Sequence, residues 1–437
     1  MLKKFGCILT VLMLVLCLCG CSLFSAETAE LLSPPALTGD MLPISEALKA
    51  SVSSEYTLEY PSRGNYRSAI VMHDIDRNGI LEAFAFYSTT KDNSTFMNIN
   101  VVNNIDGLWK SVSQEQIAAG GVDRIDFCDL DGDGLEEILV GWEIYGTSER
   151  QLAVYSLGET SLFQRMLEQY THFITCDLDA NDHNEVLIIK SSPAENLNTA
   201  HLYSITSKGV SQTGYCELDS TAKTLNHPIV ATLSTGAPAV YIDEIKGVGA
   251  VTEVLFLEKG ILKNPLLDLD TKETSQTLRS ASFESFDINE DGILEIPVQT
   301  EVPTVTKSEN SEKLYLTDWC SFNGVTLTSQ LTTIINASDG YYFILPAKWR
   351  GKISVLKDTQ DSTMEIYRYD KKKKVSKERL MYFKTVKKSD WDRGQYKNQD
   401  ITEILNDGTT SYLCYISAAA EKDGVDIKKV INDFKLY

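Results

Sequence analysis

The chain has 437 residues, with 41 Lys and Arg against 61 Asp and Glu, and a formal net charge of −20. A chain this acidic repels phosphate backbones, which argues against a nucleic-acid partner. The sequence contains no H-E-x-x-H zinc motif, G-x-S-x-G elbow, Walker loop or dinucleotide fingerprint. We therefore predict a protein that is not an enzyme.

Residues 1–21 have the pattern of a bacterial lipoprotein signal. Lys3 and Lys4 form a basic start, an apolar core follows, and residues 18–21 (LCGC) match a lipobox in which Cys21 receives the lipid. An ordinary signal peptide or an N-terminal membrane anchor is the alternative. No later stretch offers the roughly 18 uninterrupted apolar residues of a spanning helix. We expect an exported protein, anchored by lipid to the outer face of the bacterial cell membrane.

Residues 22–60 begin with a polar, proline-containing segment that is typical of a tether. A short helix is predicted over residues 44–52, followed by an extended segment, YTLEYP. This region would space the protein from the membrane and lead into the first repeat.

Four acidic nonapeptides mark residues 61–339, each lying between two short apolar-rich runs. They carry Asp or Asn at positions 1, 3 and 5 and Glu at position 9. Oxygen-bearing side chains at alternate positions of a tight loop converge on one point, and such ligands suit Ca²⁺. The predicted calcium ligands are Asp74, Asp76, Asn78, Glu82, Asp129, Asp131, Asp133, Glu137, Asp177, Asp179, Asn181, Glu185, Asp287, Asn289, Asp291 and Glu295.

An EF-hand and a plain acidic turn are the alternatives to an inter-strand calcium loop. An EF-hand needs a bidentate Glu at position 12 and flanking helices, whereas position 12 here is apolar and the surrounding sequence is β-rich. Asp, Asn and Gly also dominate turns that bind no metal. Four copies with one ligand pattern favour calcium. The second loop is the strongest candidate, and the third, with Asp182 replacing glycine at position 6, is the weakest.

The spacing of the loops predicts one further, degenerate repeat. Successive loops begin 55, 48 and 110 residues apart, and residues 231–239 (ATLSTGAPA) fall midway in the last interval. They keep glycine at position 6 but have no ligand side chain beyond weak hydroxyls. Five repeats of about fifty residues, each with room for four strands, have the size of propeller blades. We predict a mainly β fold with a β-propeller of about five blades, an open array being the alternative.

The strings D-x-[DN]-x-[DN]-G-x-x-E at 74–82, 129–137 and 287–295 resemble FG-GAP/VCBS-type repeats, with relaxed copies beginning at 177 and 231. Repeats of this family form the β-propellers of integrin α-chain heads and many bacterial surface proteins. The resemblance implies blades with calcium bound in an inter-strand loop, and a role at the cell surface. Bacterial members of the family include adhesins, lectin-like modules and non-catalytic parts of enzymes.

Residues 340–437 differ in composition from the rest of the chain. They hold 20 Lys and Arg against 14 Asp and Glu (+6), which leaves 21 against 47 (−26) elsewhere. Strand-like runs at 352–357, 364–369, 380–386 and 411–418 precede a final amphipathic helix, so we predict a small α+β domain. The run of four lysines at 371–374 suits an anionic polymer or lipid headgroup, or is a solvated hairpin tip.

Three functions fit this organisation, the simplest being a structural envelope protein with no soluble ligand. The favoured one is a surface module in which calcium stiffens the loops and another face binds an extracellular protein or glycan. The alternative is a polysaccharide-active or other cell-envelope enzyme with its site at the propeller axis or in the C-terminal domain. Each repeat carries its acidic loop at the equivalent position, so the loops are spread around the predicted ring. The two carboxylates of a glycosidase must converge within about 5–10 Å, so metal binding explains the loop carboxylates better.

Overall fold

The computed structural model describes residues 41–92, 94–158, 161–192, 194–280, 283–303, 311–312, 314–372, 375–396 and 399–436. The predicted lipidation site Cys21, with the signal and most of the tether, lies outside these residues. The described chain is mainly β, as predicted, and its sheets are antiparallel. Among the described residues, no helix has both the length and the apolar character needed to cross a membrane.

Helix α3 (Met41–Ser51) precedes three sheets that share one plan. In each sheet an acidic nonapeptide joins two paired strands, the second of which begins at the Glu of position 9. The first sheet comprises β1 (Tyr56–Leu58), β2 (Ile70–His73), β3 (Glu82–Lys91), β4 (Ser94–Ile105) and β5 (Leu108–Ile117). The second comprises β6 (Gly121–Cys128), β7 (Glu137–Glu143), β8 (Arg150–Leu157) and β9 (Leu162–Tyr170). The third comprises β10 (His172–Cys176), β11 (Glu185–Ser192), β12 (Leu197–Thr206) and β13 (Gly209–Leu218).

The degenerate repeat folds as the same unit. Strands β15 and β16 pair across a turn in which Gly236 has a φ of 86°. The fourth sheet comprises β14 (Thr224–Leu225), β15 (Ile229–Thr232), β16 (Pro238–Lys246), β17 (Gly249–Glu258) and β18 (Ile261–Lys263). The short pair β19 (Leu267–Asp268) and β20 (Glu273–Thr274) follows.

Two sheets form the C-terminal part of the chain. The fifth comprises β21 (Ile296–Glu301), β23 (Tyr315–Phe322), β24 (Leu327–Asn336), β25 (Tyr341–Ile344) and β31 (Phe434–Leu436). The sixth comprises β22 (Ser311–Glu312), β26 (Ile353–Asp358), β27 (Thr363–Asp370), β28 (Val375–Lys387), β29 (Thr402–Asn406) and β30 (Thr410–Ile416). The helices are η1 (Ala337–Asp339), η2 (Ala347–Trp349), α4 (Lys388–Asp392), α5 (Ala418–Lys422) and α6 (Ile427–Asp433).

The C-terminal segment departs from the sequence expectation in two ways. The boundary expected at residue 340 falls inside the fifth sheet, because β24 pairs with β25 and β25 pairs with β31. The final helix is also shorter than the sequence predicts, since the amphipathic pattern runs over residues 422–436. Helix α6 ends at Asp433, and Phe434 begins the short strand β31. The Phe434 side chain joins the core between the fifth and sixth sheets.

In the first four sheets, the strand that follows the loop (β3, β7, β11 or β16) is buried on both faces over most of its length, because it lies between two packed layers. Along β3, Phe84 and Phe86 pack against the second sheet, whereas Ala83, Ala85 and Tyr87 pack against α3. Successive side chains of a strand point to opposite faces, so each such strand serves two cores. This explains why these strands read as continuous apolar runs.

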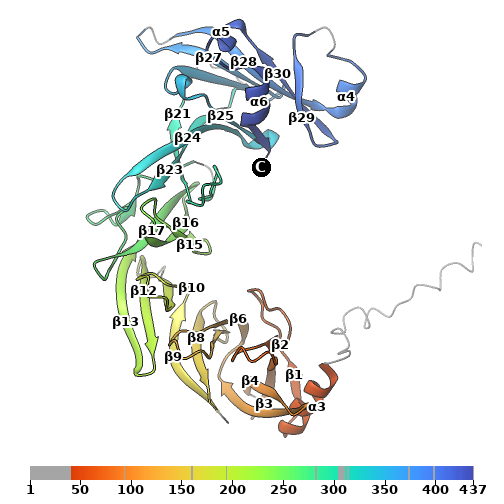
Figure 1. Cartoon of the computed structure of the whole chain (residues 1–437), viewed down its shortest axis with the longest axis vertical. Coiled ribbons are helices and arrows are strands. Elements are labelled where there is room, and N and C mark those ends of the chain that lie inside the picture. The colour runs from red at the N-terminus through yellow and green to blue at the C-terminus, as the bar shows by residue number, and fades with distance from the viewer. Residues whose placement is uncertain are drawn as a thin grey trace, which may run out of the picture.

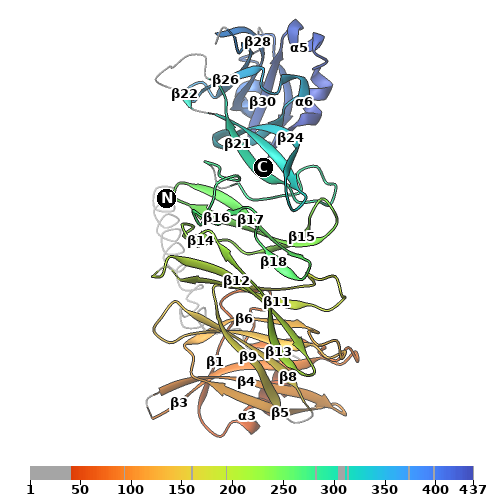
Figure 2. The same ribbon diagram turned by 90° about the vertical axis from the view of Figure 1, so that its left-hand side faces the viewer.

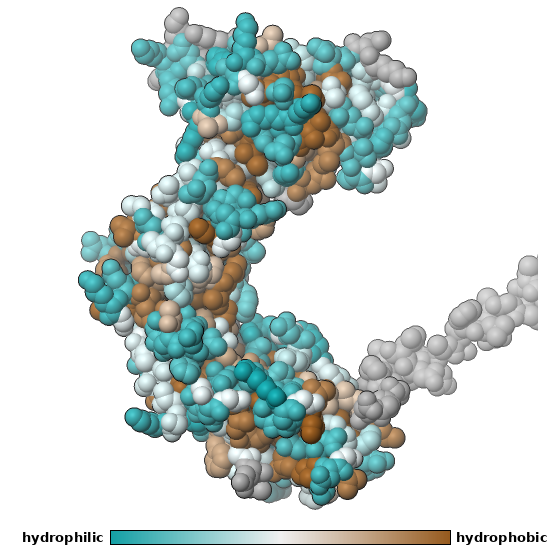
Figure 3. Space-filling view, viewed as in Figure 1, coloured by the Kyte–Doolittle hydropathy of each residue, from teal (hydrophilic) through white to brown (hydrophobic). Residues whose placement is uncertain are grey.

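The sheets lie face to face in a curved row (Figures 1 and 2). In the third sheet, β10 lies on the hollow side of the curve and β13 on the outer side (Figure 1). Successive sheets stack as propeller blades do, but the row does not close into the predicted ring. The first and last sheets stand at opposite ends of a wide hollow (Figure 3). Ile44 and Leu48 of α3 already cover the outward apolar face of the first sheet, so that face needs no further blade.

Candidate metal centres

The four acidic loops share a hydrogen-bond framework centred on the first Asp. In the first loop, the N–H groups of Asn78 and Gly79 donate to Asp74 Oδ1 and Oδ2 at 3.0 and 2.8 Å. This carboxylate therefore closes the turn. Backbone N–H groups of the other loops donate in the same way to Asp129, Asp177 and Asp287.

Each loop contains two residues in the left-handed backbone region. Position 6 was expected to need glycine, and Gly134 there has a φ of 92°. Asp182 takes the same conformation in the third loop, with a φ of 68°. Position 4 is left-handed as well, which sequence reasoning missed because Arg77 and Glu290 stand there in place of glycine.

The Glu at position 9 is buried and faces back into its loop. Glu137 Oε2 accepts the Leu130 N–H at 2.9 Å, and the three other loops repeat this bond. Burial, reinforced by the neighbouring Asp carboxylates, raises the pKa of this Glu in every loop, to about 6 at Glu185 and about 7 at Glu295. A nearby cation would favour the charged form and offset the burial.

Three loops gather carboxylates closely enough to hold a metal ion. In each, one oxygen from positions 1, 3 and 9 lies within 4.8 Å of the others, and the groups are Asp74, Asp76 and Glu82; Asp129, Asp131 and Glu137; and Asp177, Asp179 and Glu185. The third loop thus gathers its carboxylates as closely as the first two do.

Some predicted ligands lie outside these groups. Asp133 Oδ1 accepts the Leu135 N–H at 2.8 Å and does not join the second group. In the first and third loops, the position-5 amides of Asn78 and Asn181 donate to the Asp at position 3. In the fourth loop, the Asn289 amide donates to Asp291 at 2.9 Å, and this loop forms no such carboxylate group among the described residues.

One ligand oxygen of the second loop tests whether a cation fits this site. Asp131 Oδ1 is buried and has no hydrogen-bond partner among the described residues. A buried carboxylate oxygen left unsatisfied is costly, on the order of 1–3 kcal/mol. A hard divalent cation held by Asp129, Asp131 and Glu137 would satisfy it, so the donor set fits Ca²⁺.

Neighbouring loops also touch one another. Glu136, beside the second loop's position 9, accepts from Arg77 at 2.9 Å and pairs with His73 Nε2 at 2.5 Å. Its N–H donates to the Ile75 carbonyl at 2.9 Å. The His183 ring of the third loop lies directly over Gly132. The three carboxylate groups are therefore linked in series along the row.

A buried carboxylate outside the loops, Asp123, does not have the features of a catalytic base. It pairs with Arg63 through two bonds of 2.5 and 2.7 Å, with Arg150 at 3.1 Å, and accepts the Tyr170 hydroxyl at 2.5 Å. Burial acts to raise its pKa, but the bonds from Arg63 and Tyr170 outweigh it and lower the pKa. Its oxygens are fully engaged, so it joins strands rather than accepting protons.

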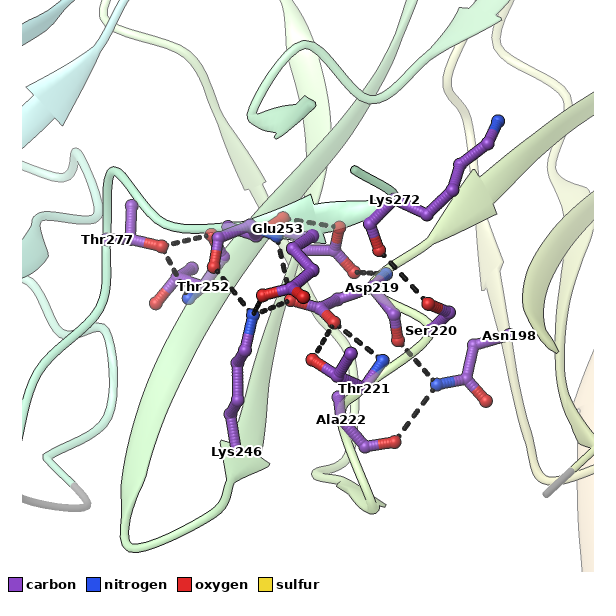
Figure 4. A network of polar contacts seen from close by, with 12 residues as sticks. Asn198, Asp219, Ser220, Thr221, Ala222, Lys246, Thr252, Glu253, Lys272 and Thr277 are labelled. Carbon is purple, nitrogen blue, oxygen red and sulfur yellow. Dashed lines mark hydrogen bonds and ion pairs between the residues drawn. The ribbon is translucent and has the colours of Figure 1, made fainter. Parts of the chain in front are cut away.

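The fourth sheet holds a second buried polar network (Figure 4). Glu253 accepts the Asp219 N–H at 3.0 Å and the Thr274 hydroxyl at 2.9 Å, and Lys246 pairs with Asp219 at 2.9 Å. Neither oxygen of the adjacent Glu244 has a good hydrogen-bond partner among the described residues. Burial and the nearby Glu253 raise the pKa of Glu244 well above its ordinary value, which favours the neutral form of this carboxyl.

No protein-family model and no curated protein match the sequence. Solved structures that match in part include the exotype rhamnogalacturonan lyase YesX, at 15% identity and a TM-score of 0.31, with 74% of this chain and 65% of that one covered. Others are the Dos1 propeller (8% identity, 72% and 70% covered, TM-score 0.27) and the Pseudomonas aeruginosa periplasmic gluconolactonase PpgL (12%, 73% and 86%, TM-score 0.26). At these scores the likeness assigns neither a family nor an activity.

Proposed function

We propose that this protein is a calcium-binding, lipid-anchored surface module whose loops hold Ca²⁺ and whose remaining surface binds an extracellular protein or glycan. The observation that carries the calcium assignment is the threefold recurrence of a two-Asp, one-Glu group within 4.8 Å. The buried oxygen of Asp131 that lacks a partner supports it independently. The FG-GAP/VCBS-type repeat pattern, with its inter-strand loops, agrees with the same assignment.

In this proposal calcium has a structural role. The ion offsets the charge of two Asp and one Glu per loop. It also fixes the turn between the two strands that the loop joins. Because Glu136 and His183 connect one loop to the next, occupation of one site stiffens its neighbours. Lipidation at Cys21 would hold the row at the membrane by residues 22–40.

The test is a thermal melt of residues 22–437, a chain that retains every described residue. It is measured with millimolar calcium and with excess chelator. Calcium at a hundredfold over its dissociation constant adds about 2.7 kcal/mol of stability per site. A large calcium-dependent rise in Tm supports structural metal sites. An unchanged Tm would mean that the loops are ordinary acidic turns.

One observation keeps the enzyme alternative in view. A surface cavity of about 690 Å³ beside β18 is lined by Glu217 and Glu258 together with Tyr215 and Phe256. Glu217 forms an ion pair with Lys272 at 2.7 Å. If the protein cleaves polysaccharide here, E217Q and E258Q must each abolish the activity. Absence of activity on polysaccharides in the unmodified chain speaks for the binding role.

A further inference from the structure

A basic pocket lies at one end of the sixth sheet, far along the row from α3. Its volume is about 450 Å³, and it is formed by residues 350–352, just before β26, and residues 368–372, at the end of β27. The pairing of Ile353 with Arg368 and a 2.7 Å bond from the Tyr369 N–H to the Lys352 carbonyl bring the two segments together. One strand register therefore builds the whole pocket.

Five cationic side chains line this pocket, against one carboxylate. The carboxylate is Asp370, and the cations are Arg350, Lys352, Arg368, Lys371 and Lys372. Arg350 pairs with Asp318, and Arg368 pairs with Asp423 and, at 3.6 Å, with Glu378, so the charge that an entering anion would offset is mainly that of the three lysines. Residues 340–437 carry a net charge of +6, whereas the rest of the chain carries −26. An anion is therefore attracted to this segment more than to the rest of the protein.

Each of the two arginines is held in place by a carboxylate that also accepts a hydrogen bond from another side chain. Arg350 pairs at 2.8 Å with Asp318, which also accepts the Thr332 hydroxyl. Arg368 pairs at 2.9 Å with Asp423, which also accepts the Trp349 indole N–H. Each guanidinium has five N–H donors, so donors remain after these bonds are made.

The three lysines differ from the arginines. No carboxylate of the described residues lies within ion-pair distance of Lys352, Lys371 or Lys372. Lys371 also bends back over the other segment, since a Cβ added at Gly351 would lie 3.2 Å from its Nζ. Its ammonium group thus approaches the backbone of Gly351 instead of extending away from the hairpin.

We propose that this pocket binds a phosphate group, either free or carried by a lipid or polymer. Phosphate oxygens accept hydrogen bonds from guanidinium and ammonium groups. A phosphate here could accept from the remaining arginine N–H groups and would offset the charge of the three lysines. This site is separate from the acidic loops and does not depend on calcium binding there.

The experiment titrates residues 22–437 with inorganic phosphate by calorimetry, in calcium-free buffer at low ionic strength. The triple variant K352Q/K371Q/K372Q is compared with K422Q/K428Q/K435Q, which removes three exposed lysines from the same part of the chain. We expect the pocket variant to lose at least tenfold in affinity and the control to stay within twofold. Thermal melts confirm that both variants are folded.

Vesicles then distinguish the source of the phosphate. Co-sedimentation with phosphatidylglycerol vesicles but not phosphatidylcholine vesicles, lost in the pocket variant, identifies a lipid headgroup. Phosphate binding without vesicle binding identifies a soluble or polymer-borne phosphate. The proposal is overturned if the unmodified chain does not bind phosphate, or if both triple variants lose affinity equally, because the lysines would then act only through net charge.

Discussion

Arg165 places its Nη1 atom 3.5 Å from Asp131 Oδ2, at the edge of the second carboxylate group. The guanidinium is held there by Ser156, whose hydroxyl accepts from Nη1 at 2.9 Å and donates to Glu137 Oε1 at 2.9 Å. A built-in cation thus stands beside the oxygens that would bind calcium. It partly neutralises the carboxylates of this group and would repel a calcium ion bound there.

Replacing this arginine should strengthen calcium binding at the second loop. Arg165→Met keeps most of the side-chain volume but removes a positive charge, which lowers electrostatic repulsion by on the order of 1 kcal/mol and tightens the site about fivefold. Calcium titration by calorimetry measures the change. Arg393→Met removes the same charge at the end of α4 and should leave the affinity unchanged. Weaker binding in R165M would show that the arginine organises the site rather than opposing it.

Two neighbouring carboxylates should contribute unequally to the same site. Asp131→Asn alters a ligand with an otherwise unpartnered oxygen and should weaken the second site at least tenfold. Asp133→Asn should cost less than threefold, because that side chain mainly accepts the Leu135 N–H. Thr235→Ala, in the degenerate repeat, should have no effect on calcium. Equal losses from all three changes would refute the assignment of ligands.

Two loop glycines separate backbone strain from contact between loops. Gly134 has a φ of 92° and open space around its Cα, so Gly134→Ala should cost only the left-handed strain, about 1–2 kcal/mol. Gly132 has a φ of 76°, and an added Cβ would overlap the His183 ring. Gly132→Ala should therefore destabilise by a further 1–3 kcal/mol, roughly. Urea unfolding measures both, and equal losses would mean that the His183 contact carries no energy.

The buried carboxyl of Glu244 should make stability depend on pH. Its folded-state pKa lies well above the ordinary value of 4.5, so the folded state holds a proton that the unfolded chain releases. Its contribution is present below pH 4.5 and declines as pH rises toward the folded pKa, by at most about 1.4 kcal/mol per unit. Glu244→Gln should flatten the pH dependence from pH 5 to 8 and be more stable than the unmodified chain at pH 8. Urea unfolding at each pH tests this, with exposed Glu421→Gln as control.

The repeat units could be predicted from the sequence because their signals are local. A strand, a loop with fixed polar positions and an apolar strand recur within about fifteen residues, and the backbone bonds of Asp74 and its equivalents lie in that same span. The degenerate repeat was predicted from its spacing, Gly236 and its apolar flanks. The sequence could not show that Asp131 joins the carboxylate group and Asp133 does not. This difference depends on which backbone N–H donates to each carboxylate.

Features set by distant contacts were the ones that sequence reasoning missed. The sheets form an open row in which α3 covers the outward face of the first sheet. The apolar pattern of this helix does not reveal which sheet it packs against. The pairing of β25 with β31 joins residues about ninety positions apart. Glu244 occurs in an ordinary strand pattern, and only the packing of the fourth sheet shows that it is enclosed beside Glu253.

Because α3 ends the row at the first sheet, the number of repeats is not fixed by geometry. In a closed ring, insertion or loss of one blade changes the angle between every pair of neighbours. Among the described residues, the cores between sheets are built from sheets that are neighbours in the row, so a repeat can be duplicated or deleted with largely local adjustment. The length of the row, and with it the distance between α3 and the C-terminal pocket, is thus a quantity that evolution can adjust in whole repeats.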